Sequence, residues 1–87
     1  MKKFSHHYYN SLLKEADSKG GRVERINLSA LYLKELPDFI KDLHVENRFD
    51  VSHNSLTSCK NFPRYVEGVI SARSNKITSL DGLQHRL

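Results

Sequence analysis

Hydrophobic and polar residues follow two different periods along this chain, and the period changes near residue 22. Before that point, apolar residues recur every third or fourth position, which is the spacing of an amphipathic helix. We expect a helix over residues 4–18, with Ser5 as its N-cap and Gly20 at its end, because glycine readily takes the left-handed conformation found after many helices. The expected apolar stripe consists of Phe4, Tyr8, Tyr9, Leu12, Leu13 and Ala16.

After residue 22, apolar and polar residues alternate in three short segments. Alternation of this kind is typical of a strand with one buried face. The segments predict three strands that share one interior. Their inward pairs are Ile26 and Leu28, then Phe49 and Val51, and finally Ile70 and Ala72. Further apolar residues extend the core around the turns: Leu33, Leu36, Leu56, Cys59, Ile77, Leu80 and Leu83.

The second half of the chain repeats itself with a period of 21 residues. Residues 45–59 align with residues 66–80, so that Asn54 falls on Asn75. Residues 23–37 follow the same pattern, except that Leu31 stands where the other two segments have asparagine. Position by position, the pattern resembles the leucine-rich repeat, in the short form found in bacterial and bacteriophage proteins.

The resemblance implies an α/β fold, namely a short solenoid with a parallel sheet of three strands and an N-terminal capping helix. We expect the cap over residues 1–22 and repeats over 23–87, divided into 23–44, 45–65 and 66–87. The link around Pro63 is too short and proline-interrupted for a long helix between strands. An alternative use of the first helix is that Tyr8, Tyr9 and the adjacent His6 and His7 contact a partner.

Asn54 and Asn75 are expected to have a structural role. A side-chain amide carries both a carbonyl and an NH2 group, so it can satisfy backbone donors and acceptors that a tight turn leaves buried. Cys59 takes a leucine place and is expected to be a packing residue.

Composition adds limits on size and partners. Eighty-seven residues form one small domain at most, and three repeats are about the minimum for a stable repeat array. The net charge of +4 favours attraction to acidic proteins or to nucleic acid without choosing between them, and most charges are expected to be plain solvated surface. The single cysteine excludes an internal disulfide. No apolar run suits a signal peptide or a membrane span, so we expect a soluble cytoplasmic protein.

The sequence offers little for catalysis. Its five histidines and one cysteine lack metal-ligand spacing, Ser52 and His53 lack a nucleophile elbow, and Gly20 and Gly21 precede a strand rather than open a helix. It also lacks the aromatic and basic strand motif of RNA-binding sheets. We therefore expect no enzymatic activity, no cofactor, no metal and no small-molecule substrate.

The exposed, concave face of the sheet is the expected binding surface. Strand alternation and stacking place Arg25, Arg48 and Val69 in one column, and Asn27, Asp50 and Ser71 in the next. Arginine can bind carboxylates or phosphates through two hydrogen bonds at once, and it is favoured at binding hot spots. The expected partner-binding residues are Arg25, Asn27, Arg48, Asp50, Ser52, Ser71 and Arg73.

The chain ends in an apolar segment with Leu80, Leu83 and Leu87 and with no recognisable cap. An uncapped edge strand invites pairing, so a homodimer through this end, a docked partner strand, or a chain cut from a longer protein are all open. We expect a non-enzymatic protein-binding module, in the form of a small inhibitor or adaptor of bacterial or phage origin that occludes a host complex. The alternatives are a basic accessory protein that binds nucleic acid or a nucleoprotein, and a self-assembling structural fragment.

Overall fold

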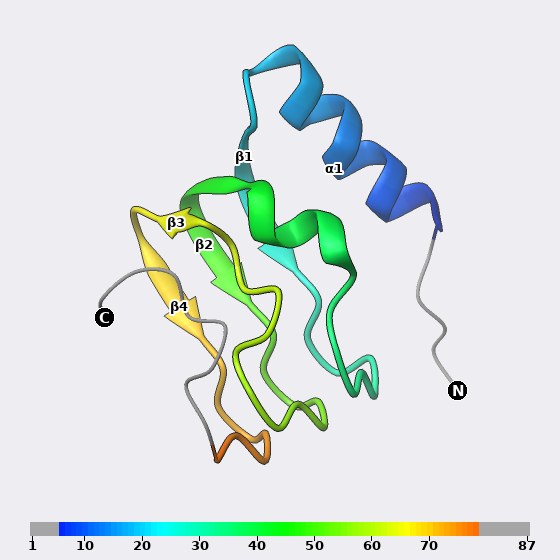
Figure 1. The fold of residues 1–87 in the computed structure, drawn as a ribbon, viewed down its shortest axis with the longest axis vertical. Coiled ribbons are helices and arrows are strands. Elements are labelled where there is room, and N and C mark those ends of the chain that lie inside the picture. The colour runs from blue at the N-terminus through cyan, green and yellow to red at the C-terminus, as the bar shows by residue number, and fades with distance from the viewer. Residues whose placement is uncertain (1–5, 79–87) are drawn as a thin grey trace.

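The computed structural model describes residues 6–78, which contain one α-helix, one short 3-10 helix and four strands (Figure 1). This mixture of a helix with a parallel sheet agrees with the α/β class expected from the sequence. In chain order the elements are α1 (His6–Ser18), β1 (Arg22–Asn27), η1 (Asp38–Asp42), β2 (His44–Asp50), β3 (Tyr65–Val66) and β4 (Val69–Ser71).

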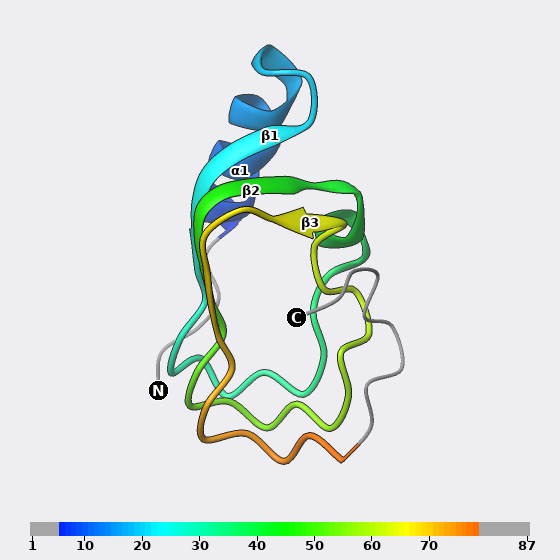
Figure 2. The same cartoon turned by 90° about the vertical axis from the view of Figure 1, so that its left-hand side faces the viewer.

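All the strand pairs of this sheet are parallel. β2 lies in the middle, with β1 on one side and both β3 and β4 on the other. Ile26 pairs with Phe49, and Phe49 pairs with Ile70, so the three predicted strand segments are neighbours. Hydrogen bonds continue past the strand ends, and Figure 2 shows successive passes of the chain that follow nearly the same course. We call residues 22–43 the first pass, 44–64 the second and 65–78 the third.

The third predicted strand is interrupted, which the alternation pattern did not predict. Glu67 and Gly68 separate β3 from β4. A Cβ atom on Gly68 would lie 1.9 Å from the carbonyl oxygen of Asn47, so the two backbones approach closely here. The β1–β2 register also shifts at this level, where Val23 pairs with Val45 but Arg25 pairs with Arg48. An extra residue in β2 thus lies opposite the break in the third strand.

The core lies between the sheet and the returning segments of each pass. The predicted inward residues of the first two strands are fully buried, and Phe49 packs edge-to-face on Phe62 with 5.2 Å between ring centroids. Cys59 is a buried free thiol within this core, in agreement with a packing role. The inward residues of the third pass, Ile70, Ala72 and Ile77, pack against the core but are only partly buried.

Helix α1 ends where the glycines predicted. The N–H group of Gly21 donates to the carbonyl of Ala16 at 2.7 Å, and Gly20 has a φ of 69°, which is a left-handed C-terminal cap. Leu12 and Ala16 are buried as expected. Leu13 was predicted to join the apolar stripe, but it is 43% exposed, so this prediction is wrong. The predicted residues Phe4 and Ser5 lie outside the described range.

Helix α1 covers the free edge of β1, on the side away from β2 (Figure 1). The backbone N–H of Asn27 donates to the hydroxyl oxygen of Tyr8 at 2.7 Å, and the N–H of Glu24 donates to the carboxylate of Glu15 at 2.8 Å. Two outward backbone donors of the edge strand are therefore satisfied by helix side chains.

The turns after successive strands share a strained position. Ala30, His53 and Ser74 have φ values of 56°, 57° and 57°, a left-handed conformation that residues with a Cβ rarely adopt. Each lies at the same place in its pass, because the N–H of Ala30 donates to Ser52 and that of His53 donates to Arg73.

Replacing Ala30 by glycine should therefore stabilise the protein by roughly 0.5–1 kcal/mol, since glycine removes the clash but loses more chain entropy on folding. Urea unfolding measures the difference. Ala16→Gly is the matched control, because the same change inside a helix should lower stability by about 1 kcal/mol or more. A loss of stability in both variants would contradict the assigned strain.

Candidate functional site

The exposed face of the sheet carries the two predicted columns of side chains. Arg25 pairs in register with Arg48, and Arg48 with Val69; Asn27, Asp50 and Ser71 form the next column. The Arg48 side chain is 51% exposed and Val69 is 53% exposed. The structure thus brings together five of the predicted partner-binding residues: Arg25, Asn27, Arg48, Asp50 and Ser71.

A depression lies between β1 and β2 on this face. Ile26 contributes to its lining, and the polar residues around it are Arg25, Asn27, Asn47, Arg48 and Asp50. Sequence reasoning missed Asn47 because the extra residue in β2 takes it out of simple alternation. No sequence signal marks that extra residue except the 21-residue repeat itself, in which Asn47 aligns with Gly68.

Asp50 is fixed at the end of β2. Its Oδ1 atom accepts hydrogen bonds from the backbone N–H of Ser52 at 3.0 Å and from the Ser52 hydroxyl at 2.7 Å. Its Oδ2 atom lies 3.7 Å from Nη2 of Arg48. Partial burial opposes ionisation of Asp50, but the two Ser52 hydrogen bonds and the Arg48 charge outweigh it and lower the pKa of the carboxyl. Asp50 is therefore a fixed anion on this face.

Ser52 does not belong to the exposed face. It is 5% exposed, and its hydroxyl group turns back to Asp50. Its assignment as an accessible partner-binding residue was therefore wrong. The physical reason is that the strand has ended at Asp50, so the alternation of faces no longer applies and a turn formed by the Asp50 side chain takes over.

Asn27 and Ser29 repeat this turn one pass earlier. Oδ1 of Asn27 accepts hydrogen bonds from the N–H of Ser29 at 3.1 Å and from its hydroxyl at 2.8 Å. Within residues 6–78, the Nδ2 group of Asn27 and the guanidinium group of Arg25 have no hydrogen-bond or ion-pair partner. The first pass therefore presents unused donors where the second presents a paired arginine.

Arg73 lies apart from these groups. It follows β4 in the turn that also contains the left-handed Ser74, and its side chain is exposed. The depression between β1 and β2 does not include it. Of the three predicted arginines, only Arg25 and Arg48 line the same hollow.

The two repeated asparagines bind backbone groups of neighbouring passes. Oδ1 of Asn54 accepts from the N–H groups of Leu31 and Leu33, and its Nδ2 donates to the carbonyls of residues 28, 51 and 52. Asn75 accepts from the N–H of Leu56 and donates to the carbonyls of residues 51, 72 and 73. Each amide therefore joins its own turn to the turn of the preceding pass.

A further asparagine, Asn61, is buried and was not predicted. It has a left-handed φ of 66°, and its Nδ2 donates to the carbonyl of Leu36 at 2.9 Å and to Asp38 at 3.2 Å. It ties the return segment of the second pass to that of the first. The available signal was that asparagine tolerates the left-handed conformation better than most residues.

Charged side chains link the helix to the strands at the other end of the sheet. Lys19 bridges Glu15 and Glu46 at 3.2 and 3.1 Å, Arg22 lies 3.3 Å from Glu46, and Nε2 of His44 lies 2.6 Å from Glu67. Hydrogen bonds to Glu46 and Glu15 raise the pKa of Lys19, and the same bond from Lys19 lowers the pKa of Glu46. These pairs are solvent-exposed, so each contributes little to stability.

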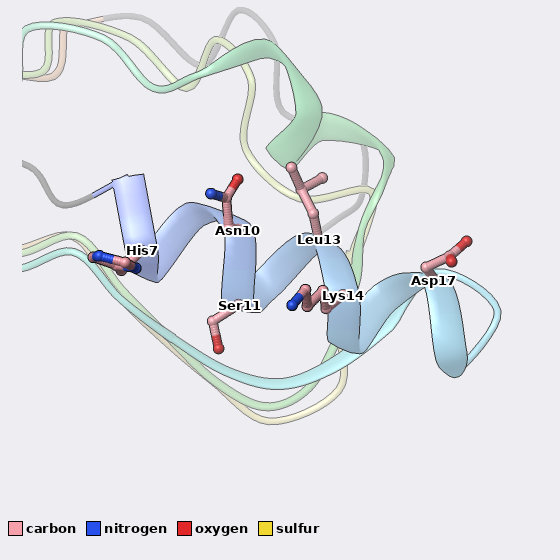
Figure 3. A pocket seen from close by; sticks show the side chains of 6 residues that line it. All are labelled: His7, Asn10, Ser11, Leu13, Lys14 and Asp17. Atoms are coloured by element: carbon pink, nitrogen blue, oxygen red, sulfur yellow. The ribbon is translucent and has the colours of Figure 1, made fainter.

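The outer face of α1 is polar and open. Figure 3 shows the six side chains that line a shallow hollow there: His7, Asn10, Ser11, Leu13, Lys14 and Asp17. All come from one helix, so they do not enclose a ligand. Tyr8 and Tyr9, which the sequence offered as alternative partner contacts, are half-buried instead, and Tyr9 packs edge-on against Phe39 at 5.2 Å. Burial raises the pKa of Tyr9 to about 12.

Other kinds of site receive no support from the part of the chain that the structure describes. No group of three or more histidine, cysteine, aspartate or glutamate side chains gathers there as metal ligands. None of its helices has the length and apolar character needed to cross a membrane. Leu80, Leu83 and Leu87, the predicted C-terminal interface, lie outside the described residues. In comparisons with family models, with curated proteins and with solved structures, nothing matches this chain.

Proposed function

We propose that this chain is a short leucine-rich-repeat protein whose three repeats form a solenoid, and that it works as a non-enzymatic protein-binding module. The repeated register of the strands and the equivalent hydrogen bonds of Asn54 and Asn75 support the repeat assignment. The binding role rests on the exposed face of the sheet. A small inhibitor or adaptor that occludes a surface of a host complex is the form that the bacterial and phage-like repeats favour.

The observation that carries the proposal is the placement of Arg25 beside Arg48. Side chains that pair in register on parallel strands are about 5 Å apart at the backbone, and like charges at this spacing are unfavourable. Asp50 offsets only one of the two charges. A surface that keeps such a pair exposed gains most when a partner covers it with acceptors, and arginine is enriched at binding hot spots for this reason.

Charge reversal at two of the predicted partner-binding arginines tests the proposal. The Arg48→Glu/Arg73→Glu variant should lose a protein that the unmodified chain captures from bacterial lysate, and its affinity for that protein, once purified, should fall at least about tenfold. Lys34→Glu/Arg64→Glu is the charge-matched control, since both residues are exposed and neither is among the predicted partner-binding residues. Equal capture by the two double variants would refute the assigned surface.

Binding to nucleic acid is the second candidate, favoured by the neighbouring exposed arginines Arg25 and Arg48 and by the net charge of +4. Its mark is a steep fall in affinity with salt, because phosphate contacts release counterions. A mobility-shift titration at about 50 mM salt separates the two candidates. A shifted band that disappears in the Arg48→Glu/Arg73→Glu variant would favour nucleic acid over protein.

A further inference from the structure

The polar groups that point into the depression between β1 and β2 are mainly hydrogen-bond donors. A guanidinium group has five N–H donors and no acceptor, and none of those on Arg25 has a partner within residues 6–78. The Nδ2 group of Asn27 adds two N–H donors that also have no partner within residues 6–78. Asn47, which is exposed, and Arg48 also line the depression.

Two of the four side-chain acceptor oxygens of the depression are occupied by neighbouring groups of the protein. Oδ1 of Asn27 is taken by the backbone and hydroxyl of Ser29, and Oδ1 of Asp50 by the same two groups of Ser52. Of the other two oxygens, Oδ2 of Asp50 lies 3.7 Å from Nη2 of Arg48. Donors therefore outnumber open acceptors in the depression, which favours a ligand that brings acceptors.

The charge of the depression selects among ligands rich in acceptors. Two guanidinium groups and one carboxylate leave one net positive charge. Asp50 stays ionised, so it cancels one of the two guanidinium charges. A single carboxylate on the ligand balances the one positive charge that remains, whereas a phosphate dianion or a run of nucleic-acid phosphates brings more negative charge than the depression neutralises. Planar carboxylates also match the two-pronged donor geometry of arginine.

We infer that the depression formed by Arg25, Asn27, Asn47 and Arg48 binds one aspartate or glutamate side chain from an acidic segment of the protein partner. This inference rests on the proposed protein-binding function. Arg25 supplies the principal charged donors, because Arg48 is partly held by Asp50. The open face allows an extended segment to reach the hollow, and the amide donors of Asn27 flank the bound oxygens.

The test uses two synthetic peptides, acetyl-Gly-Gly-Glu-Gly-Gly-amide and its glutamine counterpart, added to the full chain. The readout is the NMR signals of the arginine Nε–H groups and the asparagine side-chain amides. The glutamate peptide should shift the signals of Arg25, Arg48 and Asn27 in a saturable way, and the glutamine peptide should not. The Nε–H signal of Arg64, which is exposed outside the depression, is the internal control and should stay unchanged.

Substitutions sharpen the result. Arg25→Gln should weaken binding of the glutamate peptide about tenfold, and Arg25→Lys should weaken it less, because the charge remains but the fork of donors is lost. Arg64→Gln should have no effect. Each variant is checked for an otherwise unchanged spectrum, and a variant that fails to fold is replaced by Asn27→Ala, which removes two of the flanking donors.

Several outcomes would overturn the inference. Equal responses to the two peptides, or a shift of Arg64 as large as that of Arg25, would mean that the hollow does not select a carboxylate. Stronger binding of inorganic phosphate or of a short thymidine oligonucleotide than of the glutamate peptide would assign the hollow to phosphate. The proposed function fails separately, if charge reversal at Arg48 and Arg73 leaves the captured protein bound.

Discussion

Gly68→Ala is expected to destabilise the protein by about 3 kcal/mol, the upper end of the usual range for overpacking. The added Cβ would lie 1.9 Å from the carbonyl oxygen and 2.8 Å from the carbonyl carbon of Asn47. Both are backbone atoms of the central strand, so no flexible side chain can move aside. The third pass must shift away from β2 to relieve the clash, which breaks hydrogen bonds on both sides of the break.

Urea unfolding measures this effect, with trimethylamine oxide added if the variant is too unstable for a native baseline. Gly20→Ala is the matched control. Gly20 has no atom within 4 Å of the new Cβ but has a φ of +69°, so its substitution should cost only about 1 kcal/mol of conformational strain. Equal losses in the two variants would show that close packing on Asn47 is not what requires glycine at position 68.

Asn54→Ala should lower the free energy of unfolding by roughly 1–3 kcal/mol, because it leaves buried backbone groups without partners. The amide makes five hydrogen bonds to the backbone, two as acceptor and three as donor. They join the turn of the second pass to that of the first, so their loss affects two passes together. Solvent reaches this buried position poorly, so water cannot readily replace the lost partners.

Asn75→Ala is the natural comparison for Asn54→Ala. Asn75 has one bond as acceptor and three as donor, and it is only partly buried, so water can take over some of its partners. Its substitution should cost less than that of Asn54. A larger cost for Asn75, measured by the shift of the urea midpoint, would contradict the ranking by burial.

The hydrophobic pattern and the repeat predicted three neighbouring strand segments, and the structure confirms them. Ile26, Phe49 and Ile70 align because alternation fixes which face is buried, and the repeat fixes which residues are equivalent. The same reasoning placed Arg25 beside Arg48. This reasoning works for residues inside a strand, because successive side chains there point to opposite faces of the sheet.

The predictions that failed lie where a strand or a pattern ends. Ser52 follows the last residue of β2, and the Asp50 side chain there replaces alternation with a turn. The break at Gly68 depends on a close backbone approach across two passes, which a single sequence does not reveal. Leu13 follows the helical period but lies at the border of the stripe, so it remains exposed.

The missing asparagine of the first pass, which looked like a departure from the pattern, has a structural explanation. Asn54 and Asn75 each reach back to the turn before their own. Leu31 is at the equivalent place in the first pass, and among the described residues no earlier turn stands beside it. Among residues 6–78, an amide at position 31 would therefore have no preceding turn to join, and Leu31 packs against the core instead.

Tyr8 and Glu15 accept hydrogen bonds from the backbone of β1, so this edge of the sheet is not open to a further strand. A strand added beside β1 would have to displace helix α1. The backbone N–H groups of Glu24 and Asn27 would then lose their present acceptors. Engineered copies of the 21-residue unit should therefore be inserted after β2 and not before Arg22. After β2, the asparagine of each new copy can form hydrogen bonds with the backbone of the preceding turn.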